Sequence, residues 1–171
     1  MSKKIVFSGD VGNLNQPIIK DPQCVKETDY VVIESTYGDR THGDKIPDYV
    51  GEFTRILKET FDRGGNVVIP SFAVGRTQEI LYFIREIKEE NRIPEYPDFE
   101  VYVDSPLANE ATTIFNEHIY DCFDEEAMAL VKKGINPLMF PGLKTSITSD
   151  DSKAINFDED SRLAMTAAIR Q

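Results

Sequence analysis

Residues 66–79 read NVVIPSFAVGRTQE, and this stretch predicts the fold of the chain. The apolar run Asn66–Ile69 predicts a buried strand, Gly75 a tight loop, and Arg76 with Thr77 the start of a helix. A loop that leads into a helix presents free backbone N–H groups, where an anion can bind. Arg76 adds a planar, permanently charged guanidinium suited to phosphate or carboxylate. The stretch therefore predicts a position that holds a negative group, either a substrate's or one of the protein's own.

Outside this stretch, short apolar runs alternate with segments of helical periodicity. The runs that predict strands are Lys4–Phe7, Tyr30–Ile33 (a second buried strand), Phe99–Val103 and Leu143–Ile147. The periodic segments predict helices near 50–61, 80–87, 108–118, 125–133 and 161–170, and Ser149 has the character of a helix N-cap. Strands that alternate with helices indicate an α/β fold: a parallel, Rossmann-like three-layer sheet with helices on both faces.

The composition is that of one globular domain, with 171 residues, 40% hydrophobic and 29% charged. The net charge of −11 argues against a nucleic-acid binder that acts alone, because such proteins carry a basic surface. The longest apolar run is far below the roughly 20 residues of a membrane helix, and no signal peptide is apparent. Cys24 and Cys122 are too far apart in sequence for a C-x-x-C motif, so we expect a cytoplasmic protein without membrane contact.

Polar residues stand where the predicted strands end, at Asp10, Glu34, Ser71 and Asp104. In parallel sheets ligands gather at these carboxyl ends, so the residues are candidates for a site. Asp10 lies in a Gly-flanked turn and is either a metal ligand or an ordinary turn aspartate. Glu34 ends an apolar strand and either orients a histidine or metal, or pairs with a nearby arginine.

The remaining motifs leave alternatives open. Ser35 and Thr36 contact a phosphate or cap a turn, and Ser105 is a further candidate for substrate or phosphate binding. The Pro70–Glu79 segment resembles a Walker loop only in part, because a proline replaces its first glycine and an arginine its lysine. His42 and His118, the only histidines, are scattered and make a complete zinc site improbable by themselves.

Four strings in order resemble the β-CASP branch of the metallo-β-lactamase superfamily, which contains RNA-processing nucleases. They are Phe7–Asp10, Glu34–His42, Pro70–Glu79 and Val103–Ala108. The resemblance covers roughly residues 4–156. The sequence lacks the family's H-x-H-x-D-H cluster and the later motif histidines. We therefore expect a fragment of a longer protein that contains the cap domain.

The resemblance implies roles for the two carboxylates. Asp10 corresponds to the aspartate that bridges two zinc ions in the family, and Glu34 to an acidic active-site residue paired with a histidine supplied elsewhere. Residues 1–35 then form a C-terminal piece of the metallo-β-lactamase part, and residues 36–171 the β-CASP cap.

For a full-length parent the resemblance implies phosphodiester cleavage of RNA with two zinc ions, and partnership of this chain with the remaining metallo-β-lactamase domain. The residues that would contact the substrate are Ser71, Gly75, Arg76, Ser35, Thr36 and Ser105. The chain alone is expected to hold no zinc, since one carboxylate cannot make a site. The alternatives are a Rossmann-like module that binds a nucleotide or phosphate without catalysis, and a structural domain used for protein contacts.

Overall fold

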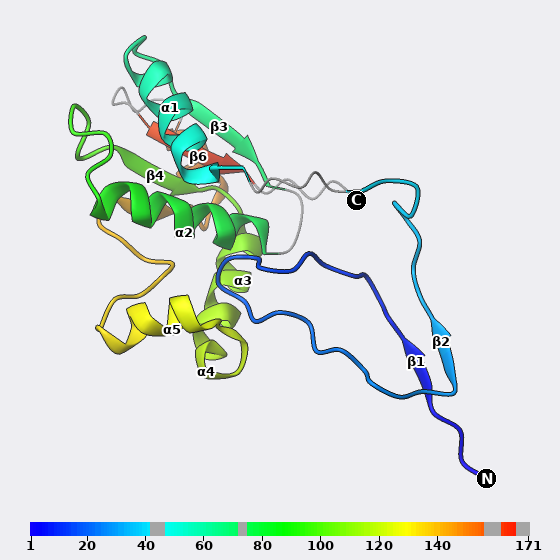
Figure 1. The fold of residues 1–171 in the computed structure, drawn as a ribbon. Helices are drawn as coiled ribbons and strands as arrows, with labels where there is room; N and C mark the ends of the chain where they lie inside the picture. The colour runs from blue at the N-terminus through cyan, green and yellow to red at the C-terminus, as the bar shows by residue number, and fades with distance from the viewer. Residues whose placement is uncertain (42–46, 72–74, 156–161, 167–171) are drawn as a thin grey trace.

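A computed structural model describes residues 1–41, 47–71, 75–155 and 162–166 (Figure 1). The strands are β1 (Ile5–Phe7), β2 (Tyr30–Val32), β3 (Val67–Pro70), β4 (Glu100–Val103), β5 (Leu143–Thr145) and β6 (Arg162–Thr166). The helices are α1 (Tyr49–Phe61), α2 (Arg76–Glu89), α3 (Pro106–Glu117), α4 (Ile119–Cys122), α5 (Glu125–Lys132) and α6 (Ser149–Ala154). The protein is therefore α/β, as predicted. No helix in the described part of the chain has the length and apolar character to cross a membrane.

All strand pairs are parallel, and they form a two-stranded sheet, β1-β2, and a four-stranded sheet of order β3-β6-β4-β5. The prediction of a helix over 161–170 is wrong for residues 162–166, which form β6 in the interior of the larger sheet, and its other residues lie outside the described ones. This segment contains leucine, alanine and methionine, which favour helices by intrinsic propensity. Pairing with β3 on one side and β4 on the other outweighs that preference.

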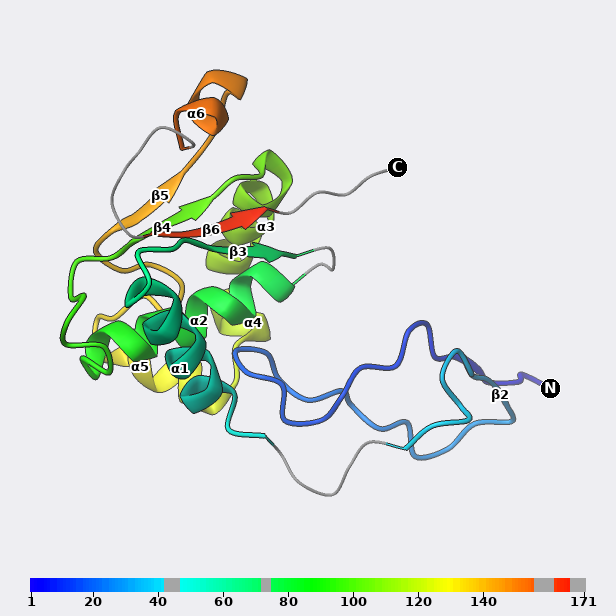
Figure 2. The same cartoon turned by 90° about the horizontal axis from the view of Figure 1, so that it is seen from above.

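Helices α1 and α2 cover one face of the four-stranded sheet (Figure 2). Val101 and Val103 of β4 are almost fully buried in this layer, in one core with Leu57 of α1 and Ile84 of α2. The opposite face is only partly covered, since Val68 of β3 is 62% exposed and α6 lies on that side near β5.

The strand predicted at 66–69 is present as β3, but the prediction that it is buried is wrong for one face. Strand β3 alternates between partly buried and exposed residues, because described elements cover only its inner face. The pair β1-β2 departs further from the expectation of burial. All three residues of β2 are more than half exposed, since no layer of described residues packs on either face.

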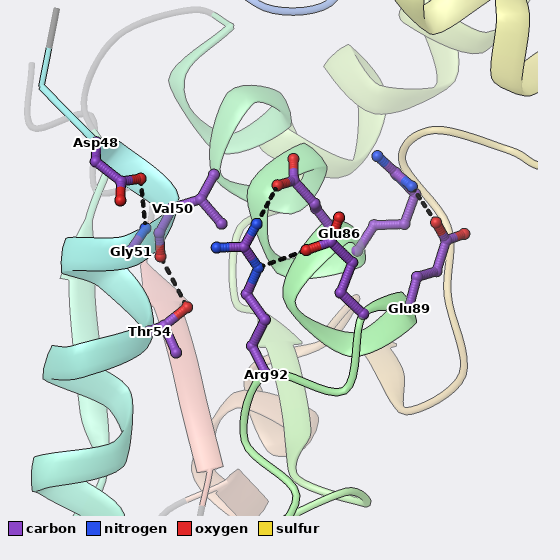
Figure 3. Close-up of polar contacts among 9 residues, drawn as sticks. Asp48, Val50, Gly51, Thr54, Glu86, Glu89 and Arg92 are labelled. Carbon is purple, nitrogen blue, oxygen red and sulfur yellow. Dashed lines mark hydrogen bonds and ion pairs between the residues drawn. The ribbon is translucent and has the colours of Figure 1, made fainter.

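A capping hydrogen bond lies at the start of α1, and an ion pair lies near the end of α2 (Figure 3). The carboxylate of Asp48 accepts a hydrogen bond from the Gly51 N–H at 2.8 Å and begins α1. Beyond the end of α2, the Arg92 guanidinium bonds the Glu86 carboxylate at 3.0 Å. The N-cap of the short helix α6 is Thr148, one residue before the predicted cap Ser149, which is the first residue of the helix.

The long connection between β1 and β2 contacts the helical layer through residues 15–21, which we call the clasp. Ile18 at its tip is 2% exposed, and its carbonyl oxygen accepts a hydrogen bond from the Asp124 N–H at 2.7 Å. The Lys20 N–H donates to the Cys122 carbonyl at 2.9 Å. Main-chain bonds thus join the segment that follows β1 to the end of α4 and to the N-cap of α5.

Candidate functional site

The carboxyl ends of β1 and β2 bring Glu34 beside the turn that carries Asp10. The Glu34 carboxylate accepts a hydrogen bond from the Val11 N–H at 2.6 Å, and its own N–H donates to the Ser8 hydroxyl at 3.1 Å. Gly9 has a φ of 56°, which lets the chain turn directly after the strand. Asp10 is exposed. Parallel pairing in register therefore places the Asp10 turn and the Glu34 side chain at one sheet edge.

The hydrogen bonds at Glu34 favour its ionised form. The Thr36 hydroxyl donates to Oε2 at 2.7 Å, and this bond, followed by the Val11 N–H, lowers the pKa of Glu34 below that of an ordinary glutamate. Thr36 is thus engaged by the carboxylate, while Ser35 is exposed and its carbonyl accepts the Gly38 N–H at 3.1 Å. Glu34 is a negative, acceptor-only group at neutral pH.

The N-terminus of α2 starts at Gly75, as the sequence predicts. Gly75 is the N-cap with a φ of 84°, a conformation that favours glycine, and it offers no capping side chain. Arg76 donates through Nη1 to the Glu79 carboxylate at 2.5 Å along the same helix, and its side chain is 55% exposed. The internal carboxylate expected as one partner of Arg76 is therefore Glu79, and the pair leaves much of the guanidinium in solvent.

The two predicted serines occupy different environments. Ser71 follows β3 and is 2% exposed, and its Oγ has no hydrogen-bond partner within the described ranges. Ser105 is the N-cap of α3 and accepts the Ala108 N–H at 3.2 Å, so it performs a structural task.

Asp104 also ends a strand, and its partners could not be read from the sequence. Its carboxylate accepts hydrogen bonds from Ser146 and, at 2.8 Å, from Ser152 of α6. These bonds connect β4 to the end of β5 and to α6. The signal available in the sequence was its place in the Asp-Ser-Pro turn, which indicates a polar strand end but gives no partner.

A cavity of about 180 Å³ lies between the clasp and the N-terminus of α2. Its lining residues come from both elements and from α3: Gln16, Pro17, Ile18, Ile19, Gly75, Arg76, Glu79 and Phe115. In both views β1 and β2 lie on the side toward which the carboxyl ends of β3 and β6 point (Figures 1 and 2). Both groups of candidate residues therefore belong to this side of the molecule.

Metal binding requires more ligands than this edge provides. Across residues 1–41, 47–71, 75–155 and 162–166, no three His, Cys, Asp or Glu side chains lie close enough to hold a metal ion. His118 is exposed, with Nδ1 at 3.8 Å from Asp121, and His42 lies outside the described residues. Both Cys24 and Cys122 are free and exposed. The described donor set does not fit a zinc site by itself.

Comparison with known proteins identifies one family. Residues 77–168, more than half of the chain, match the model of the Beta-Casp domain. The matched part begins in α2 and includes β4, β5 and β6.

Curated proteins with similar sequences include several nucleases. The chain is 38% identical to "Ribonuclease TTHA0252" of Thermus thermophilus over 90% of its own length and 34% of that protein. It is 30% identical to "Endoribonuclease YSH1" of Yarrowia lipolytica over 82% of its length and 17% of that protein. It is 29% identical to "Cleavage and polyadenylation specificity factor 73" of Drosophila melanogaster over 68% of its length and 17% of that protein. The chain thus spans at most about a third of the length of these relatives.

Proposed function

Because this chain belongs to the Beta-Casp family, we propose that it forms the substrate-gripping cap of an RNA-processing phosphodiester hydrolase. The names of its relatives support an RNA substrate, since they include a ribonuclease and an endoribonuclease. The observation that carries the proposal is the contact between Glu34 and the Asp10 turn, because it assembles two carboxylates at one sheet edge.

The two carboxylates have different tasks in this proposal. Asp10 is exposed and is the one metal ligand that the chain contributes, to a pair of zinc ions whose other ligands come from elsewhere. Glu34 already accepts bonds from Val11 and Thr36, which supports a role in orienting a histidine rather than in holding metal. When bound, the metal would supply Lewis acidity and an activated water.

The phosphate-binding part of the cap is the N-terminus of α2. Its backbone N–H groups and the exposed guanidinium of Arg76 suit a phosphate of the RNA backbone. Gly75 permits close approach, and the hydroxyl of Ser71, which has no partner among the described residues, is a further donor at the end of β3. The proposed substrate contacts also include Ser35, Thr36 and Ser105. Thr36 and Ser105 already form hydrogen bonds within the protein.

The proposal extends to domain organisation. Residues 1–35 would belong to a metallo-β-lactamase domain and residues 36–171 to the cap. The exposed faces of β1-β2 support such a partner domain, because apolar strand residues are normally covered. The exposed side of β3 would likewise be covered in a three-layer, Rossmann-like cap. Free Cys24 and Cys122 suit a cytoplasmic location.

An exchange experiment tests the proposed function. This chain replaces the matched 154 residues of the Thermus ribonuclease, and RNA cleavage and bound zinc are measured for the chimera. We expect cleavage by the chimera. Asp10→Ala should remove metal and cleavage together, whereas Glu34→Gln should keep the metal and slow cleavage, since it disturbs an orienting hydrogen bond.

The unmodified ribonuclease and the melting temperature of each chimera serve as controls for activity and folding. A folded chimera that cleaves RNA equally well with Asp10→Ala would contradict the assignment of Asp10. Loss of metal with Glu34→Gln alone would show that the two roles are exchanged.

A further inference from the structure

We propose that the cavity between the clasp and α2 binds one nucleobase of an RNA strand. This inference rests on the proposed function and adds a base-recognition site to it. The cavity of about 180 Å³ is lined by the polar side chains of Gln16, Arg76 and Glu79 and by apolar side chains that include Ile18 and Phe115. A planar base has an apolar face and a polar edge, so it can contact both kinds of lining side chain.

Phe115 provides an aromatic wall. Its side chain is partly buried and packs against the apolar core, which holds the ring. Its ring tip would lie 3.8 Å from a Cβ built at Gly75, so the ring stands directly beside the α2 N-terminus. A held aromatic ring is a stacking surface for an unpaired base and loses little conformational entropy on binding.

Gln16 provides a group that can read the base edge. It is partly buried, lines the cavity, and makes no hydrogen bond to any residue that the structure describes. A glutamine amide is both donor and acceptor, and can therefore bond the edge of a nucleobase. Glu79 has an assigned partner in Arg76, which leaves Gln16 as the unpaired amide of this cavity.

Arg76 connects the base to the phosphate backbone. One of its nitrogens is bonded to Glu79, which orients the guanidinium at the cavity. The remaining donors can bond a phosphate while the base of the same nucleotide enters the cavity. The clasp also follows Asp10 in the chain, so a base bound here sets the register of the strand relative to that carboxylate.

Binding of oligonucleotides to the full 171-residue chain tests the base site. The probes are 8-nucleotide oligoadenylate and oligouridylate, and an abasic ribose-phosphate strand of equal length, in low salt. We expect the base-containing strands to bind more tightly than the abasic one. Phe115→Leu should weaken their binding by about five- to 150-fold, the range for loss of one stacked base, and leave the abasic strand unchanged.

Gln16→Leu is the second variant, because Gln16 is only partly buried and lies outside the helices and strands, so the change should leave folding intact. It should change the ratio of oligoadenylate to oligouridylate affinity. Phe140→Leu and Gln23→Leu are matched controls outside the cavity and should bind all strands as the wild type does.

Equal affinity of the wild type for abasic and base-containing strands would overturn the base site. So would unchanged binding by both Phe115→Leu and Gln16→Leu. If Arg76→Ala weakens every strand while these two variants do not, only the base site falls and the proposed phosphate contact stands. If no strand binds and the chimera does not cleave, the proposed function itself falls.

Discussion

The carbonyl oxygen of Ile18 accepts the Asp124 N–H at 2.7 Å, and this bond connects the tip of the clasp to the N-terminus of α5. Ile18 is 2% exposed and has a φ of 79°. A β-branched residue in this region is strained by its Cβ, so burial of the side chain must offset a backbone cost. The contact therefore combines favourable burial of the Ile18 side chain with an unfavourable backbone conformation at the same residue.

This combination predicts an unusual order of stability. Ile18→Ala should lower the free energy of unfolding by about 2–5 kcal/mol, because it leaves a cavity. Ile18→Gly should be more stable than Ile18→Ala by about 0.5–1 kcal/mol, since glycine releases the strain. Urea denaturation measures both. At Ile19, whose φ is not positive, alanine should be the more stable of the two replacements, and the same order at both positions would contradict the strain argument.

The lowered pKa of Glu34 predicts that the contact between Glu34 and the Asp10 turn weakens at low pH. A carboxylate whose pKa is lowered by folding adds to the free energy of unfolding at pH values above the ordinary pKa of glutamate. This contribution is lost as the pH falls through the lowered pKa. An NMR titration of the Glu34 carboxylate should therefore show a midpoint below that of an ordinary glutamate. Thr36→Val should raise this midpoint, because it removes the hydroxyl that contributes most, and Ser35→Ala should not. An unchanged midpoint in Thr36→Val would exclude that hydrogen bond.

Arg76 should matter for RNA more than for stability. Its pair with Glu79 is exposed, so Arg76→Ala should cost no more than about 0.5 kcal/mol of unfolding free energy. RNA affinity should fall, and the slope of log affinity against log salt concentration should decrease by about one, as expected for the loss of one phosphate contact. Arg55→Ala, which breaks exposed pairs with Glu52 and Glu59 on α1, is the matched control and should leave RNA affinity unchanged.

Asp104 should stabilise α6. Asp104→Ala leaves the Ser146 and Ser152 hydroxyls without this partner and should cost about 1–3 kcal/mol of unfolding free energy. Hydrogen exchange should increase in α6 first. Asp150→Ala removes an exposed carboxylate in the same helix and should change both measurements little. Equal effects of the two variants would contradict the role assigned to Asp104.

Metal analysis of the isolated chain provides a further test. After dialysis we expect less than one zinc per chain, because Asp10 alone cannot make a three- or four-ligand site. Treatment with a chelator should leave the melting temperature unchanged. One tightly held zinc per chain would show that the chain completes a metal site by itself.

The strong local signals predicted much of the architecture. Residues 66–79 combine an apolar run, a glycine and a helix start, and the structure has β3 and α2 there. Strand β6 could not be identified, because it is defined by its pairing with β3 and β4, which are distant in sequence. The clasp was missed for the same reason, since the partners of Ile18 lie beyond residue 120.

The position of β6 also has a consequence for synthesis of the protein. β6 is the last described strand in sequence, yet it is the one that pairs with β3 and connects it to β4 and β5. Until residue 166 has left the ribosome, β3 has no strand partner among the described elements, and its backbone groups must remain with water or another partner. The sheet therefore assembles late, through contacts of long sequence separation, which are slow to form. During that interval the unpaired edge of β3 is open to wrong pairing, so we expect the protein to depend on chaperones during translation, because the last described strand lies inside the sheet.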